Sequence, residues 1–113
     1  MMYKITTAQA WKAAAECGAF AGSEHDMRDG YIHLSSIHQL AATAQKYFSG
    51  VEGLVLVAVD PDVLGAALKW EPSRGGDLFP HYYGALPVTA AKWVRPLPLD
   101  RAGVPCIADV VPL

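Results

Sequence analysis

The chain has 113 residues, a length typical of one domain with a single hydrophobic core. Hydrophobic residues make up 52% of it and charged residues 18%, a composition that excludes an intrinsically disordered protein. The formal net charge is −2, and no Lys or Arg is followed by another, so the basic surface of a protein that binds extended nucleic acid is missing.

Two further features concern the compartment. The longest aliphatic run, residues 54–59, is too short to cross a membrane, and residues 1–5 lack the basic flank and apolar run of a secretion signal. Cys17 and Cys106 stand far apart, without metal-ligand spacing, and are expected to be small buried hydrophobic residues. We therefore expect a cytoplasmic protein with no membrane partner.

The N-terminal part alternates strand-like and helix-like pieces. Residues 3–6 predict a short strand. The spacing Thr6-x-x-Gln9 is typical of a capping box and predicts a helix that ends near residue 17. Residues 19–29 are polar and contain glycine, which predicts a loop.

The next segment combines a strand with a second capped helix. Residues 31–35 alternate between two faces, one aliphatic (Ile32, Leu34) and one aromatic or polar (Tyr31, His33, Ser35). The spacing Ser36-x-x-Gln39 is a second capping box, and the helix it opens is expected to end at Gly50.

The C-terminal half predicts mostly strand and loop. The expected elements are a buried central strand over 54–59, a turn or short helix over 61–68, a short strand at 70–71, an irregular loop over 73–84 and a strand over 88–95. The sum is an α+β fold: a single domain over residues 1–113, with two main helices packed on one small mixed or antiparallel sheet.

His33 is the first candidate functional residue. It faces away from the aliphatic side of its strand and precedes a helix N-terminus, where free amides favour an anion. A phosphate or carboxylate near His33, Ser35 and Ser36 follows from this placement. The alternative is a surface histidine, with Ser36 acting only as a helix cap.

Glu71 and Arg74 are the second candidates. Pro72 pushes Glu71 towards an extended backbone, so its carboxylate suits orienting a sugar hydroxyl or acting as a general base. Arg74 beside two glycines suits binding of an anionic oxygen. The alternatives are a solvated acid near Arg74 and a flexible turn.

Aromatic residues are concentrated in residues 79–84 (Phe79, His81, Tyr82, Tyr83). Such a run suits the wall of a pocket for a planar base. The alternative is that these rings anchor an irregular loop to the core.

A metal site is not expected. The histidines, with Asp26 as a further candidate ligand, show neither HExxH nor HxxxH spacing, and His33 and His38 lie across a strand-to-helix boundary. The remaining histidines are His25 and His81.

The combined motifs resemble a known family. The segments that carry the resemblance are Tyr3-Lys4-Ile5, Trp11, Gly18, Asp29-Gly30-Tyr31-Ile32-His33-Leu34-Ser35, Gln39, Trp70-Glu71 and Phe79-Pro80-His81 with Tyr83-Gly84. On them the chain is similar to the small proteins called domain of unknown function 952. The resemblance spans residues 3–96 and leaves a proline-rich tail at 97–113, which is expected to be an edge strand or coil.

This resemblance implies the ADP-ribosyltransferase-like fold and a distant likeness to the RNA 2′-phosphotransferase. It implies that NAD or a related nucleotide is the cofactor or ligand and lies against the His33 strand. His33 and Ser35 would position phosphate or ribose, and Glu71 would orient a hydroxyl. The remaining expected ligand contacts come from Tyr31, Ser36, Gln39, Arg74, His81 and Tyr83.

Three functions remain open at this point. The first is a nucleotide-handling transferase or hydrolase with His33 and Glu71 as catalytic residues. The second is a non-catalytic small-ligand module, favoured because no histidine stands in residues 3–6, where the fold's first-strand histidine is expected. The third is an interaction protein that uses residues 79–84 as its contact surface.

Overall fold

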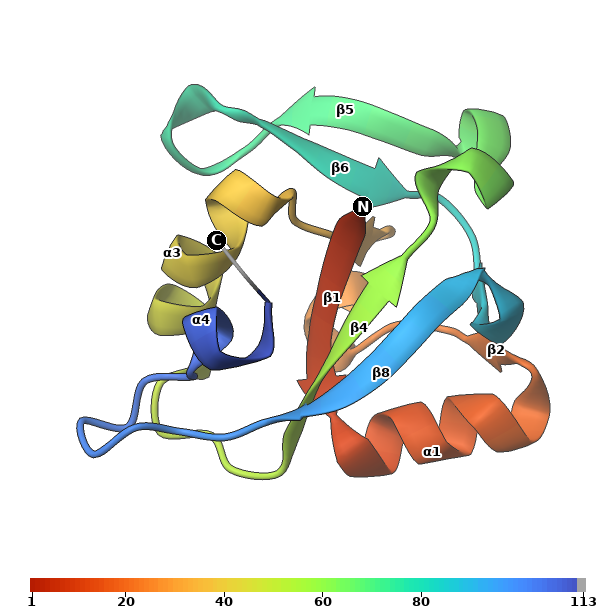
Figure 1. Cartoon of the computed structure of the whole chain (residues 1–113). Coiled ribbons are helices and arrows are strands. Elements are labelled where there is room, and N and C mark those ends of the chain that lie inside the picture. The colour runs from red at the N-terminus through yellow and green to blue at the C-terminus, as the bar shows by residue number, and fades with distance from the viewer. Residues whose placement is uncertain (112–113) are drawn as a thin grey trace.

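The computed structural model describes residues 1–111, except for the side chain of Arg74. Within this part the chain forms the α-helices α1 (Ala8–Cys17), α2 (Glu24–Asp29), α3 (Ile37–Phe48) and α4 (Ile107–Val110). Its strands are β1 (Met2–Thr7), β2 (Ala19–Phe20), β3 (Ile32–His33), β4 (Leu54–Val59), β5 (Leu68–Pro72), β6 (Leu78–Tyr82), β7 (Leu86–Pro87) and β8 (Ala91–Leu97). The predicted α+β class is confirmed (Figure 1).

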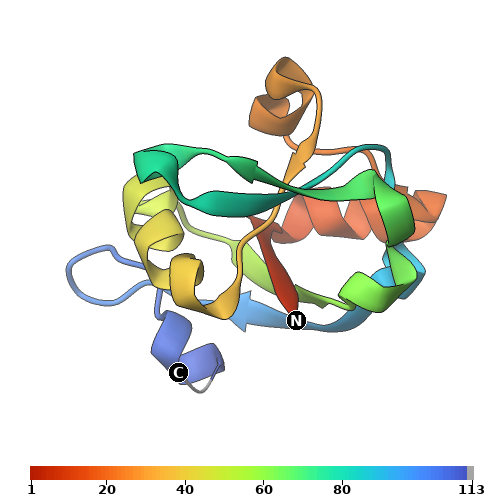
Figure 2. The same ribbon diagram turned by 90° about the horizontal axis from the view of Figure 1, so that it is seen from above.

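The strands form three antiparallel sheets, so the prediction of a single sheet was wrong. Their orders are β1-β4-β8, β2-β7 and β3-β6-β5. Seen from above, the β5–β6 hairpin crosses over the β1-β4-β8 sheet, and the orange helix α2 projects to one side (Figure 2). Hydrophobic periodicity does not show which strands pair with one another. Short strands separated by proline and glycine therefore could not be assigned to separate sheets from the sequence.

The aliphatic strand β4 is the centre of the fold, as its uninterrupted apolar sequence predicted. It pairs with β1 on one edge and β8 on the other, and all its residues are buried. One face packs with Trp11 of α1, and the opposite face with Leu40 of α3. Because both faces are covered, this strand has no polar positions.

Strand β1 carries polar side chains into the interior. Tyr3 and Ile5 pack in the core beneath α3, whereas Lys4 and Thr6 are buried on the alternate positions. The outer edge of β1 pairs with Ser35 through two backbone hydrogen bonds, of 2.8 and 2.9 Å, at Tyr3. This bridge joins the main sheet to the segment that follows β3.

The predicted loop over residues 19–29 is instead β2 followed by α2. Ser23 caps α2: its hydroxyl accepts from the Asp26 amide, and the Asp26 carboxylate accepts from the Ser23 amide. Gly30 then ends the helix with a φ of 88°, which favours glycine. The helix lacks an apolar stripe because its buried residue is Asp26, which explains why periodicity missed it.

Three smaller predictions needed correction. The cap of α1 is Thr7, whose hydroxyl accepts from the Ala10 amide, and not Thr6, which β1 keeps buried. The predicted loop over 73–84 contains β6, the middle strand of its sheet, hidden in the sequence by Pro80. The tail, predicted as edge or coil, includes the short helix α4.

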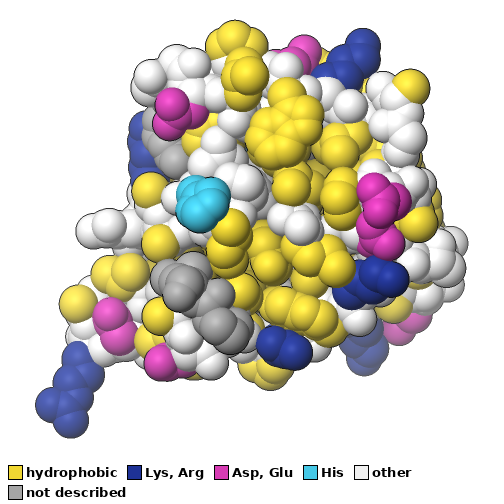
Figure 3. Space-filling model, turned by 45° about the horizontal axis from the view of Figure 1, so that its top comes forward, with side chains coloured by type: hydrophobic (Ala, Val, Ile, Leu, Met, Phe, Trp, Pro, Cys, Tyr) yellow, Lys and Arg dark blue, Asp and Glu magenta, His cyan; other side chains and the backbone are white. Residues whose placement is uncertain are grey.

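The surface includes a continuous hydrophobic area in the middle of the face shown in Figure 3, with charged side chains around it. No helix in the described part of the chain has the length and apolar character to cross a membrane.

Shortening a core side chain of β4 should measure how far the fold depends on this strand. Leu56→Ala removes a fully buried side chain and should lower the free energy of unfolding by about 2–5 kcal/mol. Val63→Ala is the control, because Val63 is 60% exposed and its loss should change stability by no more than about 0.5 kcal/mol. Urea denaturation of both variants makes the comparison, and equal effects would contradict this view of the core.

Candidate functional site

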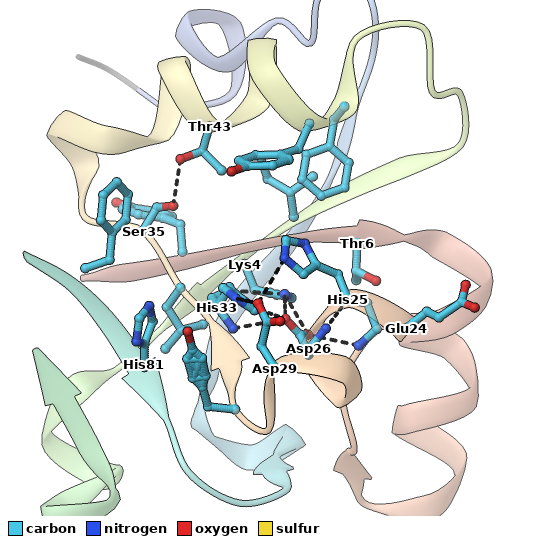
Figure 4. A pocket seen from close by; sticks show the side chains of 18 of the residues that line it. Lys4, Thr6, Glu24, His25, Asp26, Asp29, His33, Ser35, Thr43 and His81 are labelled. Carbon is cyan, nitrogen blue, oxygen red and sulfur yellow. Dashed lines mark hydrogen bonds and ion pairs between the residues drawn. The ribbon is translucent and has the colours of Figure 1, made fainter. Parts of the chain in front are cut away.

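A cavity of about 640 Å³ opens between β1, α2, β3 and α3. Its volume lies within the range of small-molecule sites. Figure 4 shows Lys4, His25, Asp26, Asp29 and His33 converging on one side of it, with Ser35 and Thr43 opposite. Hydrophobic and aromatic side chains complete the walls, among them Tyr3, Tyr31, Tyr47, Phe48 and Phe79.

The carboxylate of Asp26 holds this side of the cavity together. It accepts from Lys4 Nζ at 2.8 Å, from the His33 amide at 3.0 Å and from the Ser23 amide at 2.9 Å. Burial alone would raise the pKa of Asp26, but the hydrogen bond from His33 and the charge of Lys4 lower it below its usual range. Asp26 is therefore ionised.

Lys4 reaches Asp26 from the buried side of β1. Its ammonium group also donates to the His33 carbonyl oxygen at 3.1 Å. Burial lowers the pKa of Lys4, and the attraction of Asp26 opposes that shift. The resulting ion pair connects β1, α2 and β3, the three elements that bound this side of the cavity.

His33 is fixed in orientation by the same carboxylate. Its Nδ1 lies 2.6 Å from Asp26 Oδ1. An ionised carboxylate only accepts hydrogen bonds, so Nδ1 carries the proton and Nε2 is turned towards Asp29, whose Oδ2 lies 2.9 Å away. The Nε2 atom of His25 lies 3.1 Å from that same oxygen.

Tyr31 lines both the cavity and a neighbouring hollow. Its ring contacts those of His33, His81 and Tyr83, with centroid distances of 4.8, 4.0 and 5.3 Å. Burial, and then the negative charges of Asp29 and Glu71, raise the pKa of Tyr31. The phenol therefore stays a neutral donor or acceptor at physiological pH.

Glu71 lines the neighbouring hollow and not the main cavity. It accepts from Tyr83 Oη at 2.7 Å and lies 2.9 Å from His81 Nδ1. The hydrogen bonds from Tyr83 and His81 lower the pKa of Glu71. The hydrogen bond from Tyr83 to Glu71 also raises the pKa of Tyr83, to about 12. Glu71 thus reaches the cavity indirectly, by orienting His81.

The predicted site residues whose side chains are described divide into three groups. The first group lines the cavity and consists of Tyr31, His33, Ser35 and His81. The second group, Glu71 and Tyr83, lines the neighbouring hollow. Ser36 and Gln39 lie outside both: the Gln39 side chain accepts from the Ser36 amide and donates to the Leu78 carbonyl at 2.7 Å, which ties α3 to β6. The side chain of Arg74 lies outside the described structure.

The sequence analysis missed four polar residues of the cavity, Lys4, His25, Asp26 and Asp29, in these functional roles. The spacing Ser23-x-x-Asp26 was a usable signal, because it is a capping box that predicts α2. With α2 in place, His25 and Asp29 fall four residues apart on one helix face. Lys4 gave a weaker signal, as a charged residue at an inward position of a strand.

Comparisons with known proteins agree on the family and the fold. The family described as "Protein of unknown function (DUF952)" matches residues 5–94. The crystal structure of protein CC0527 from Caulobacter crescentus, 46% identical, superposes with a TM-score of 0.95 and covers 99% of this chain and 98% of its own. Its solution NMR structure gives 0.88, covering 98% and 96%. None of the curated proteins matches this chain.

These relatives indicate no catalytic or ligand-binding function. The CC0527 structures are targets of the Northeast Structural Genomics Consortium. The expected likeness to ADP-ribosyltransferases has no support among them.

Replacing the central carboxylate should destabilise the protein. Asp26→Asn leaves the Lys4 ammonium without its buried partner and should cost about 3–5 kcal/mol at neutral pH. Because folding lowers the pKa of Asp26, its contribution is present above its ordinary pKa of about 4 and is lost as the pH falls below that value.

Urea denaturation at a series of pH values measures both effects. Below about pH 4 the natural protein should become less stable. The variant should show a smaller decrease, because it has no Asp26 carboxylate to protonate. A variant as stable as the natural protein would contradict the central role of Asp26.

The pKa of the Tyr83 phenol should report the contact between Glu71 and Tyr83. Glu71→Gln removes the anion and should bring the pKa of Tyr83 from about 12 back towards its ordinary value of about 10. NMR of ¹³Cζ-labelled tyrosine measures the change, with Tyr83→Phe to assign the signal. A Tyr83 signal already titrating near pH 10 in the natural protein would refute this contact.

Proposed function

Because this chain belongs to the DUF952 family, whose function is unknown, we propose a function from its own cavity. The cavity binds a nucleotide-like small molecule such as NAD or ADP-ribose, and the protein acts on it as a transferase or hydrolase. The likeness to the ADP-ribosyltransferase fold and to the RNA 2′-phosphotransferase forms part of this proposal.

The observation that carries the proposal is the Asp26–His33 pair at the cavity wall. A histidine whose Nδ1 is held by a buried carboxylate keeps one tautomer and one orientation, as a ring that works on a ligand requires. Its other ring nitrogen, Nε2, lies 2.9 Å from Asp29 Oδ2, and this His33–Asp29 edge would serve the phosphate or ribose of the ligand. Ser35 lies on the opposite wall and donates to Thr43 Oγ1 at 3.3 Å.

The aromatic residues support a planar ligand group. Tyr31 and His81 line the cavity and meet in an edge-to-face contact at 4.0 Å. Flat rings of this kind favour stacking with a base or nicotinamide. In this proposal Glu71 contributes by orienting His81, and the ligand contact is made by His81 itself.

A non-catalytic binding module is the second candidate. In place of a first-strand histidine, β1 offers Lys4, which is committed to Asp26, and Thr6, which lines the cavity. Such a strand suits binding more than transfer chemistry. The third hypothesis, an interaction surface at residues 79–84, has less support, because Phe79, Pro80 and His81 are buried.

Ligand titration followed by amide NMR tests the binding proposal. NAD and ADP-ribose should each shift the amides of Tyr31, Ser35 and Thr43 and leave those of residues 100–105 unmoved. His33→Ala should weaken binding at least about tenfold, or about 1.4 kcal/mol, since it removes the oriented ring. His38→Ala is the matched control, because His38 is exposed and does not line the cavity.

The outcomes separate the two candidates. No shift at millimolar ligand would refute both nucleotide functions. Binding with release of nicotinamide that His33→Ala abolishes would establish the enzyme, and binding without any product would leave the module.

A further inference from the structure

We propose that His25, Asp29 and His33 bind a divalent transition metal ion of the zinc type at the rim of the cavity. The three residues each offer one ligand atom, and these atoms lie within 4.8 Å of one another. Two imidazole nitrogens and one carboxylate oxygen form the ligand set of metal sites that keep further positions open for water or substrate.

The distances already approach those of a coordinated ion. Asp29 Oδ2 lies 2.9 Å from His33 Nε2 and 3.1 Å from His25 Nε2. Ligand atoms at zinc-bond distance in a tetrahedral site are about 3.3 Å apart, so small rotations of the side chains would admit the ion. The two imidazole rings lie beside each other, with centroids 4.4 Å apart.

His33 also has the support that metal-binding histidines usually have. Its Nδ1 proton is held by Asp26, which leaves the Nε2 lone pair for the ion. A carboxylate behind the ligating imidazole fixes the ring and increases its basicity. Asp26 is in turn held by Lys4, so the support extends into the core.

The charged side chains on this side of the cavity are mostly acidic and favour a cation. His33 Nε2 lies 2.9 Å from a carboxylate oxygen of Asp29, a separation that either a hydrogen bond or a shared metal ion accounts for. Among the described residues lining the cavity, Lys4 is the one Lys or Arg, against Glu24, Asp26 and Asp29. A metal ion bound here would offset part of this negative charge.

Access to the position is open. The side chains of His25 and Asp29 are 41% and 34% exposed, and that of His33 is 25% exposed. An ion can enter from solvent, and its three ligands are among the residues that line the cavity. This inference departs from the sequence-based expectation of no metal site, because the spacing His25-x₃-Asp29-x₃-His33 gains meaning only once α2 is a helix.

The metal site stands independently of the proposed nucleotide function. If the metal site and the nucleotide function are both correct, the ion at His33 Nε2 binds a phosphate oxygen of the ligand. Without the ion, that phosphate would lie against the carboxylates of Asp29 and Glu24. Titration with Zn²⁺ alone tests the metal, and titration with NAD in the presence of chelator tests the nucleotide, so each can fail without the other.

The test uses the full chain, first stripped with chelator. Isothermal titration with Zn²⁺ should show one ion per chain, and Co²⁺ should give the visible absorption of an ion with nitrogen ligands. His25→Ala should reduce the affinity at least about tenfold, with Asp29→Ala and His33→Ala at least as damaging. His38→Ala and Cys17→Ser should bind as the natural protein does, since neither residue belongs to the cluster.

The decisive comparison is His25→Ala against His38→Ala, the same substitution at two exposed or half-exposed histidines. Circular dichroism confirms that both variants fold. Equal affinities in the two variants, no binding of Zn²⁺ or Co²⁺ by the natural protein, or loss of binding in Cys17→Ser would overturn the proposal. An Nε2 nitrogen of His33 that stays protonated when Zn²⁺ is added, seen by ¹⁵N NMR, would do the same.

Discussion

One buried carboxylate, that of Asp26, organises the site. It neutralises Lys4 of β1, accepts from the amide and ring of His33 in β3, and caps the helix to which it belongs. A buried charge is tolerated only when it is paired and hydrogen-bonded, so these elements are held to one geometry. The orientation of His33 follows from this arrangement, and with it the chemistry that the cavity can support.

The rest of the fold serves to bring these elements together. Strand β4, buried on both faces, provides the hydrophobic core on which β1 presents Lys4. The bridge between Tyr3 and Ser35 places the segment after β3 at the edge of the main sheet. On the other side of His33, Glu71 orients His81, so two histidines meet the aromatic ring of Tyr31 from fixed directions.

The sequence predicted the parts of this fold that depend on hydrophobic periodicity. It predicted β4, the helix that follows Ser36, and the placement of His33 on the strand face opposite the buried Ile32. It failed for α2 and β6, because α2 buries an acid in place of an apolar stripe and β6 contains a proline. The site residues on α2 were missed together with the helix. Their roles depend on contacts with residues distant in sequence, such as the contact of Asp26 with Lys4.

The central claim is that Asp26 determines the tautomer of His33, and ¹⁵N NMR of the imidazole ring tests it most directly. We expect a proton on Nδ1 at neutral pH, at the short contact with Asp26, whether or not Nε2 is also occupied. A neutral ring with its single proton on Nε2 and a bare Nδ1 would show that Asp26 does not determine the tautomer.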